Sequence, residues 1–257
     1  MRKAVSPLVR LAAVAALAAC ASSVSRNSAL APDEDPNDPL AGTRLMQQGQ
    51  ALVAEGKAAD GLERYRLALK LQPKNPTIHN LIGVAELRLG RAAKAVESFN
   101  QALTLAPQYS DARNNRGAAY IQLGQFALAE ADFLAVLSDS VHANRTGVYF
   151  NLGSLYFSRG NLSAAEENLR RAAVVSGPIE AFLMLGQVEE SMGKPELAET
   201  AYREGIVKAP ERADIALALG KLLEASGRKE EARELYLRIV SLAPDSPEAR
   251  QARSRLE

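Results

Sequence analysis

Residues 83–107 have the sequence GVAELRLGRAAKAVESFNQALTLAP, and this stretch contains the pattern that decides the fold. Gly83 and Gly90 stand seven residues apart, the large apolar Phe99 follows, and Pro107 closes the stretch. A glycine at the end of a helix tolerates the left-handed backbone of a C-cap. A proline stops the next helix because it lacks an N–H group and collides with the preceding turn. The stretch therefore predicts two short helices that pack as a hairpin.

The same pattern occurs six times along the chain. The glycines equivalent to Gly83 follow one another at intervals of 34, 34, 36, 33 and 34 residues. They are Gly49, Gly83, Gly117, Gly153, Gly186 and Gly220. The large residues equivalent to Phe99 are Tyr65, Phe99, Phe133, Leu169, Tyr202 and Tyr236. Because a glycine inside a helix costs about 1 kcal/mol relative to alanine, six in register predict a close contact between the two helices of each hairpin.

A period of 34 residues with this pattern resembles the tetratricopeptide repeat. The resemblance implies an all-α fold, a superhelix (α-solenoid) of about six helix-turn-helix repeats in which each hairpin contacts only its neighbours. The repeats span residues 42–246, in the units 42–75, 76–109, 110–143, 146–178, 179–212 and 213–246. The tryptophan that the family favours in the first helix is absent throughout. We expect residues 247–257 to form a C-terminal capping helix with a solvated, arginine-rich face.

The first twenty residues are typical of a bacterial lipoprotein signal. Arg2 and Lys3 precede an apolar run, residues 11–19, which is too short to cross a bilayer of about 30 Å. The run ends in Leu17-Ala18-Ala19-Cys20, which resembles the lipobox, and Cys20 is the only cysteine in the chain. We therefore predict a signal peptide over residues 1–19 and acyl chains such as palmitate on Cys20. The alternatives are an ordinary signal peptide that is cut nearby, or a cysteine that stands at this position by chance.

Residues 20–41 are predicted to form a flexible tether after the lipidated cysteine. They are rich in serine, proline and acidic side chains, and they hold few apolar groups that could offset the entropy of ordering. Residue 21 is Ala and not Asp. By resemblance to sorted lipoproteins of Gram-negative bacteria, this favours a lipid anchor on the periplasmic face of the outer membrane.

Composition argues against most catalytic and nucleic-acid-binding classes. The 31 Lys and Arg residues nearly balance 30 Asp and Glu, so we expect no nucleic-acid partner. One cysteine and two histidines, His79 and His142, leave little material for a metal site, and we place His142 in a surface loop. No phosphate loop or zinc-protease motif occurs. We therefore predict no enzyme, catalytic residue, metal, cofactor or small-molecule substrate; a hydrolase with an unrecognised site is the competing hypothesis.

By resemblance to the family, a partner protein would bind along the concave face that the first helices line. That face is apolar with amides in the first four units and acidic in the last two, which suits an amphipathic helix or an extended strand. The predicted groove residues are Asn80, Val84, Leu87, Arg88, Asn114, Ile121, Gln122, Phe150 and Phe157. Alternatively, Phe150 and Phe157 are core residues of an irregular unit, and Arg88 is an ordinary solvated residue. The groove hypothesis predicts that Phe150→Glu or Leu87→Glu abolishes partner capture without harming the fold.

The lipobox, the tether and the repeats together resemble the pilotin-like lipoproteins of type IV pilus biogenesis. The local likeness is greatest in Asn114–Gly117, Ala129–Phe133 and Tyr149–Gly153. The resemblance implies a scaffold that binds a secretin, or another pilus or secretion subunit, and assists its localisation and multimerisation. The competing hypothesis is an adaptor for cell-wall hydrolases or proteases, or for a tight-adherence (Flp) pilus.

Overall fold

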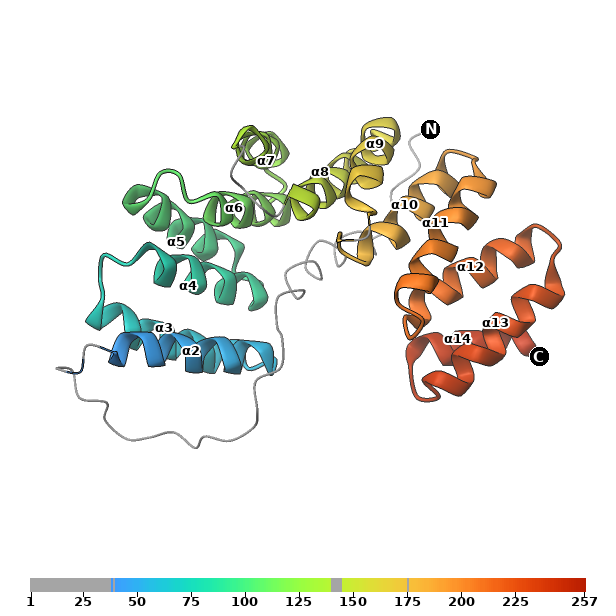
Figure 1. Cartoon of the computed structure of the whole chain (residues 1–257), viewed down its shortest axis with the longest axis horizontal. Coiled ribbons are helices and arrows are strands. Elements are labelled where there is room, and N and C mark those ends of the chain that lie inside the picture. The colour runs from blue at the N-terminus through green and yellow to red at the C-terminus, as the bar shows by residue number, and fades with distance from the viewer. Residues whose placement is uncertain (1–37, 39, 140–144, 175) are drawn as a thin grey trace. The chain divides into compact units, whose positions relative to one another are not determined.

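The computed structural model describes residues 38, 40–139, 145–174 and 176–257. The predicted signal peptide, Cys20, nearly all of the tether and His142 lie outside these residues. Within them the chain forms thirteen helices and no strand (Figure 1). The all-α repeat fold predicted from the sequence is therefore confirmed.

The helices form two compact units, which are described separately. In both units consecutive helices pair as antiparallel hairpins, and each hairpin packs on the next, as in an α-solenoid. The N-terminal unit contains α2 (Ala41–Ala54), α3 (Ala58–Leu71), α4 (Pro76–Arg88), α5 (Ala92–Leu105), α6 (Ser110–Gln122) and α7 (Phe126–Ser138). The C-terminal unit contains α8 (Arg145–Ser158), α9 (Leu162–Ala172), α10 (Glu180–Ser191), α11 (Pro195–Lys208), α12 (Ala213–Ala225), α13 (Lys229–Leu242) and α14 (Pro247–Leu256).

The glycine that ends each first helix has the left-handed backbone predicted for it. Gly90 has a φ of 73°, and the N–H of Arg91 donates to the carbonyl of Glu86 at 2.9 Å. This bond closes the last turn of α4 in the manner of a Schellman motif and sends the chain back along α5. The five equivalent glycines also have a positive φ.

The other series of glycines lets the two helices of a hairpin approach closely, as predicted. A Cβ atom added to Gly117 would lie 2.6 Å from the ring of Phe133, which is nearer than real side chains come. The same overlap with the large residue of the second helix occurs in all six hairpins. Each large residue is at most 2% exposed, so each hairpin is held together by a ring or leucine seated on a bare stretch of backbone.

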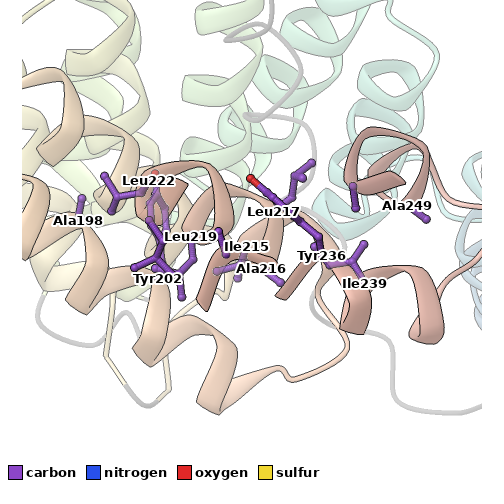
Figure 2. Packing of buried hydrophobic residues seen from close by; sticks show 13 residues of the cluster. Ala198, Tyr202, Ile215, Ala216, Leu217, Leu219, Leu222, Tyr236, Ile239 and Ala249 are labelled. Atoms are coloured by element: carbon purple, nitrogen blue, oxygen red, sulfur yellow. The ribbon is translucent and has the colours of Figure 1, made fainter. Parts of the chain in front are cut away.

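The last helix completes the core of the C-terminal unit. Ala249 and Ala252 of α14 are fully buried and join the cluster that contains Tyr236 and Ile239 of α13 (Figure 2). Ser246 caps the helix, since its hydroxyl accepts a hydrogen bond from the N–H of Ala249 at 3.0 Å. The exposed arginines of α14 give the stack a solvated end, which a terminal repeat needs.

Candidate ligand-binding faces

Two of the residues predicted to line the groove belong to the core instead. Leu87 is 2% exposed and packs with Ala92, Phe99 and Ala119, because it faces α5 and α6. Phe150 is fully buried in the C-terminal unit. Neither side chain can meet a partner, so substituting glutamate at either position would test folding and not capture. The alternative that Phe150 is a core residue is therefore correct.

The other apolar and amide residues of the predicted groove remain accessible. In the N-terminal unit Val84 of α4 and Ile121 of α6 are partly exposed, as is Asn114, and Gln122 is exposed. In the C-terminal unit Phe157 of α8 is partly exposed. The N-terminal unit thus presents two aliphatic side chains with amides beside them, which suits an amphipathic or extended peptide.

Asn80 is used to join two hairpins. Its side chain is 8% exposed; its Oδ1 accepts from Nδ2 of Asn115 at 3.0 Å, and its Nδ2 donates to the hydroxyl of Tyr109 at 3.4 Å. Asn115 was missed from the sequence, because Asn114 occupies the equivalent position and nothing in the sequence fixes the rotation of α6. Burial raises the pKa of Tyr109 above its ordinary value, so the hydroxyl stays neutral.

Arg88 also has a structural role. Its Nη1 donates to the carbonyl of Val53 at 2.7 Å, and so α4 is tied to the C-terminal turn of α2. A cation at that end of a helix also interacts favourably with the helix dipole. The guanidinium is therefore positioned by the first hairpin.

An open pocket of about 410 Å³ lies where α4 begins, beside the loop that leads into α6. Its walls are mostly apolar. They are formed by Pro76, Thr77, Ala106, Pro107, Gln108 and Tyr109. Four of these six residues belong to the connection between two repeats, outside the first helices that were predicted to line the groove. The only signal in the sequence was the pair Pro107 and Tyr109 around an interhelical turn.

The acidic residues predicted in the last two units are engaged within the fold. Tyr202 donates a hydrogen bond to Glu190, and Tyr236 donates to Glu224 at 3.0 Å. Burial, together with the bond to Glu224, raises the pKa of Tyr236 to about 12. Arg212 pairs with Glu180 at 2.8 Å and with Asp214 at 2.7 Å. These carboxylates are thus engaged by side chains of their own unit, and Arg212 offsets part of the negative charge of Glu180 and Asp214.

Buried carboxylates occupy equivalent positions in α4 and α10. Glu86 pairs with Arg66 at 3.4 Å and with Arg91 at 3.3 Å, and Glu189 pairs with Arg170 at 2.6 Å. The Glu86–Arg66 and Glu189–Arg170 pairs cross from the second helix of one hairpin to the first helix of the next, whereas Arg91 lies in the turn of the hairpin that contains Glu86. Within the described part of the chain, Oε2 of Glu189 is buried without a hydrogen-bond partner. Burial raises the pKa of Glu189 even though Arg170 lowers it.

The raised pKa of Glu189 predicts how stability responds to pH. A carboxyl with a higher pKa in the folded state stabilises the fold at low pH, and this contribution is lost as pH rises through the folded pKa. Glu189→Gln removes that loss. We therefore expect the free energy of unfolding of Glu189→Gln, relative to the unmodified chain, to increase from about pH 4 to pH 8. Urea unfolding across this range measures it; a relative stability that falls with pH would contradict the assignment.

Among the described residues, no group of three or more His, Cys, Asp or Glu side chains is arranged to hold a metal ion. In the same residues, no helix combines the length and the hydropathy needed to cross a membrane.

Comparison with known proteins identifies the family. The tetratricopeptide-repeat model matches residues 46–110, 92–147, 114–178 and 183–247, which is more than half of the chain. The chain belongs to the tetratricopeptide-repeat family, whose members are typically scaffolds that bind other proteins. No curated protein matches the chain.

Solved structures resemble the chain over most of its length. PilW, a widely conserved type IV pilus biogenesis factor, is 23% identical with a TM-score of 0.71, over 82% of this chain and 97% of PilW. PilF of Pseudomonas aeruginosa is 18% identical with a TM-score of 0.67, over 83% of this chain and 97% of PilF. YrrB, a repeat protein with an unusual peptide-binding site, is 17% identical with a TM-score of 0.52, over 74% of this chain and 97% of YrrB. At these identities the likeness establishes the fold.

Proposed function

We propose that this chain is a membrane-anchored scaffold that binds a protein partner and assists the assembly of an envelope machine, namely the type IV pilus. The observation that carries the proposal is the shared architecture with PilW and PilF, which match this chain over nearly the whole of their own length. The lipobox before Cys20 and the accessible apolar side chains of the N-terminal unit support it. The partner is a secretin or another pilus subunit, bound at the periplasmic face of the outer membrane.

The mechanism is tethering. Acyl chains on Cys20 would hold the repeats at the membrane surface, where a partner inserts, and this raises the effective concentration of one for the other. The accessible groove residues of the N-terminal unit would supply the contacts. They are Val84, Asn114, Ile121 and Gln122. No step of this function requires a catalytic group.

Ile121→Glu is expected to weaken partner capture about ten- to a hundred-fold. Burying one large aliphatic side chain is worth about 1.5–3 kcal/mol, and each 1.4 kcal/mol is a factor of ten in affinity. The matched control is Leu134→Glu, the same kind of change at a side chain on α7 that is 51% exposed. Secretin multimers from envelope extracts, and co-purification of the secretin, report the effect. Equal loss in both variants, or in neither, would contradict the groove assignment.

Cys20→Ser is expected to move the chain from the membrane pellet to the soluble periplasmic fraction. Each buried CH₂ group contributes about 0.8 kcal/mol, so removing several acyl chains removes the anchor. Labelling with palmitate, followed by fractionation, measures both the modification and its effect. Membrane association that persists without any label would refute the lipid anchor.

Crosslinking in living cells identifies the partner. A photoreactive residue in place of Gln122 should trap a secretin or pilus subunit, whereas the same residue in place of Leu134 should not. A cell-wall hydrolase trapped from Gln122 would favour the adaptor hypothesis instead.

A further inference from the structure

The pocket beside α4 exists because one repeat lacks a side chain that its neighbour has. In the first hairpin Gln72 lies over the start of α2, and a Cβ atom on Gly42 would be 2.6 Å from its Nε2. The equivalent residue in the second hairpin, one period later, is Ala106. Its methyl group leaves open the space that the glutamine fills in the first hairpin, and this space is the pocket.

The walls of the pocket select a particular chemistry. Pro76, Pro107 and Tyr109 provide apolar and aromatic surface, and the phenol of Tyr109 is held in place by Asn80. Surfaces of this kind accept the ring of a proline in an extended segment, as aromatic-lined grooves do for polyproline helices. Arg113 lies at the rim, where its Nη2 donates to the carbonyl of Pro107 at 2.6 Å. An acidic residue next to the proline would therefore meet a cation.

A segment with this chemistry lies in the chain itself. Residues 31–37 have the sequence APDEDPN, in which Pro32 and Pro36 flank three acidic residues. We propose that the pocket receives this segment, with Pro32 seated against Tyr109 and the acidic residues facing Arg113. The proposal depends neither on the lipid anchor nor on the identity of the partner.

The place where the segment joins the fold makes the contact possible. Asp38 is fixed just before the first turn of α2, because its carboxylate accepts from the N–H of Leu40 at 2.8 Å and pairs with Arg44 at 2.5 Å. Helices α2, α4 and α6 run in the same direction, so their first turns lie at one end of the N-terminal unit (Figure 1). Neighbouring helices are about 8–10 Å apart, which places the pocket within about 20 Å of Asp38. The six residues back to Pro32 span up to about 20 Å when extended.

Docking would fold the tether back along the edge of the predicted groove. The pocket is adjacent to Asn80 through Tyr109, and Asn80 contacts α6 through Asn115. A partner that extends over this edge would have to displace the segment. The tether would then act as an internal competitor for that end of the face.

Cysteine crosslinking tests the contact in the mature chain from residue 20, with Cys20→Ser. Glu34→Cys is combined with Gln108→Cys at the exposed lip of the pocket, or with Lys74→Cys as the control. Lys74 is exposed, lies one period before Gln108 in the equivalent connection and is nearer to residue 34 in sequence, so a tether that does not dock would react with it at least as fast. We expect the 34–108 disulfide to form at least ten-fold faster. Equal rates, or a faster 34–74 reaction, overturn the proposal.

A second variant tests the pocket itself by filling it. Ala106→Gln introduces the side chain that the first hairpin uses, and it should abolish the preference for the 34–108 disulfide. Ala93→Gln, on the exposed side of α5, is the matched control and should leave the rate unchanged. A preference that survives Ala106→Gln, while circular dichroism shows a folded chain, overturns the assignment of the pocket. So does a crosslinked dimer whose yield rises with protein concentration, since it places the segment on a second copy.

Discussion

Phe99→Ala is expected to lower the free energy of unfolding by about 3–5 kcal/mol. The ring is fully buried and seated on Gly83, and its removal leaves a cavity that the backbone of α4 cannot fill, because no side chain stands there. Cavities that cannot relax are the costly ones.

Urea unfolding followed by circular dichroism measures this loss. Phe99→Leu is the control, and it should cost clearly less because most of the volume is kept. The C-terminal unit should be affected little, since each hairpin of a repeat protein is stabilised by its immediate neighbours. Similar values for the alanine and leucine variants would show that the ring does not fill the space beside Gly83.

Phe150→Glu is expected to be more damaging and to unfold at least the start of the C-terminal unit. The side chain is fully buried, so the substitution both removes a large apolar group and places a charge away from water. Losses above about 4 kcal/mol are typical of such a combination.

Phe157→Glu is the informative comparison, because this residue lies on the same helix and is partly exposed. We expect it to keep the far-ultraviolet spectrum and the melting temperature close to those of the unmodified chain. Hydrogen exchange of α8 and α9 separates the two cases: rapid exchange in Phe150→Glu and protection in Phe157→Glu. Protection in both would mean that Phe150 is not part of the core.

The spacing of the glycines predicted the hairpins because each glycine is needed by the backbone or the packing within its own repeat. Gly90 needs a left-handed backbone, and Gly83 needs space for Phe99, so both requirements are visible in the sequence of a single repeat. The binding face was harder to predict. Whether Leu87 faces a partner or the next helix depends on how neighbouring hairpins pack, and residue type alone does not distinguish the two, since both surfaces accept leucine.

Two polar residues were also misassigned, because their role depends on how neighbouring hairpins pack. Asn80 and Arg88 were assigned to a peptide ligand, yet Asn115 and the carbonyl of Val53 meet their polar groups. Their partners are 35 residues away in sequence, one repeat along, and only the stacked structure brings them together. The pocket could not be predicted because it depends on a small side chain, Ala106, in the connection between two repeats.

The buried pairs Glu86–Arg66 and Glu189–Arg170 also bear on how such a chain can change over generations. Hairpins that share the same glycines and rings resemble interchangeable parts, and duplication of one could add a further repeat. A glutamate hidden in a joint is different, because it needs its arginine on the preceding part. Moving the hairpin that contains Glu189 without the preceding one would leave this buried carboxylate without Arg170, whereas Glu86 would keep Arg91 of its own hairpin. The buried pairs between hairpins therefore constrain which hairpin can follow which, and so they help to conserve the order of the hairpins.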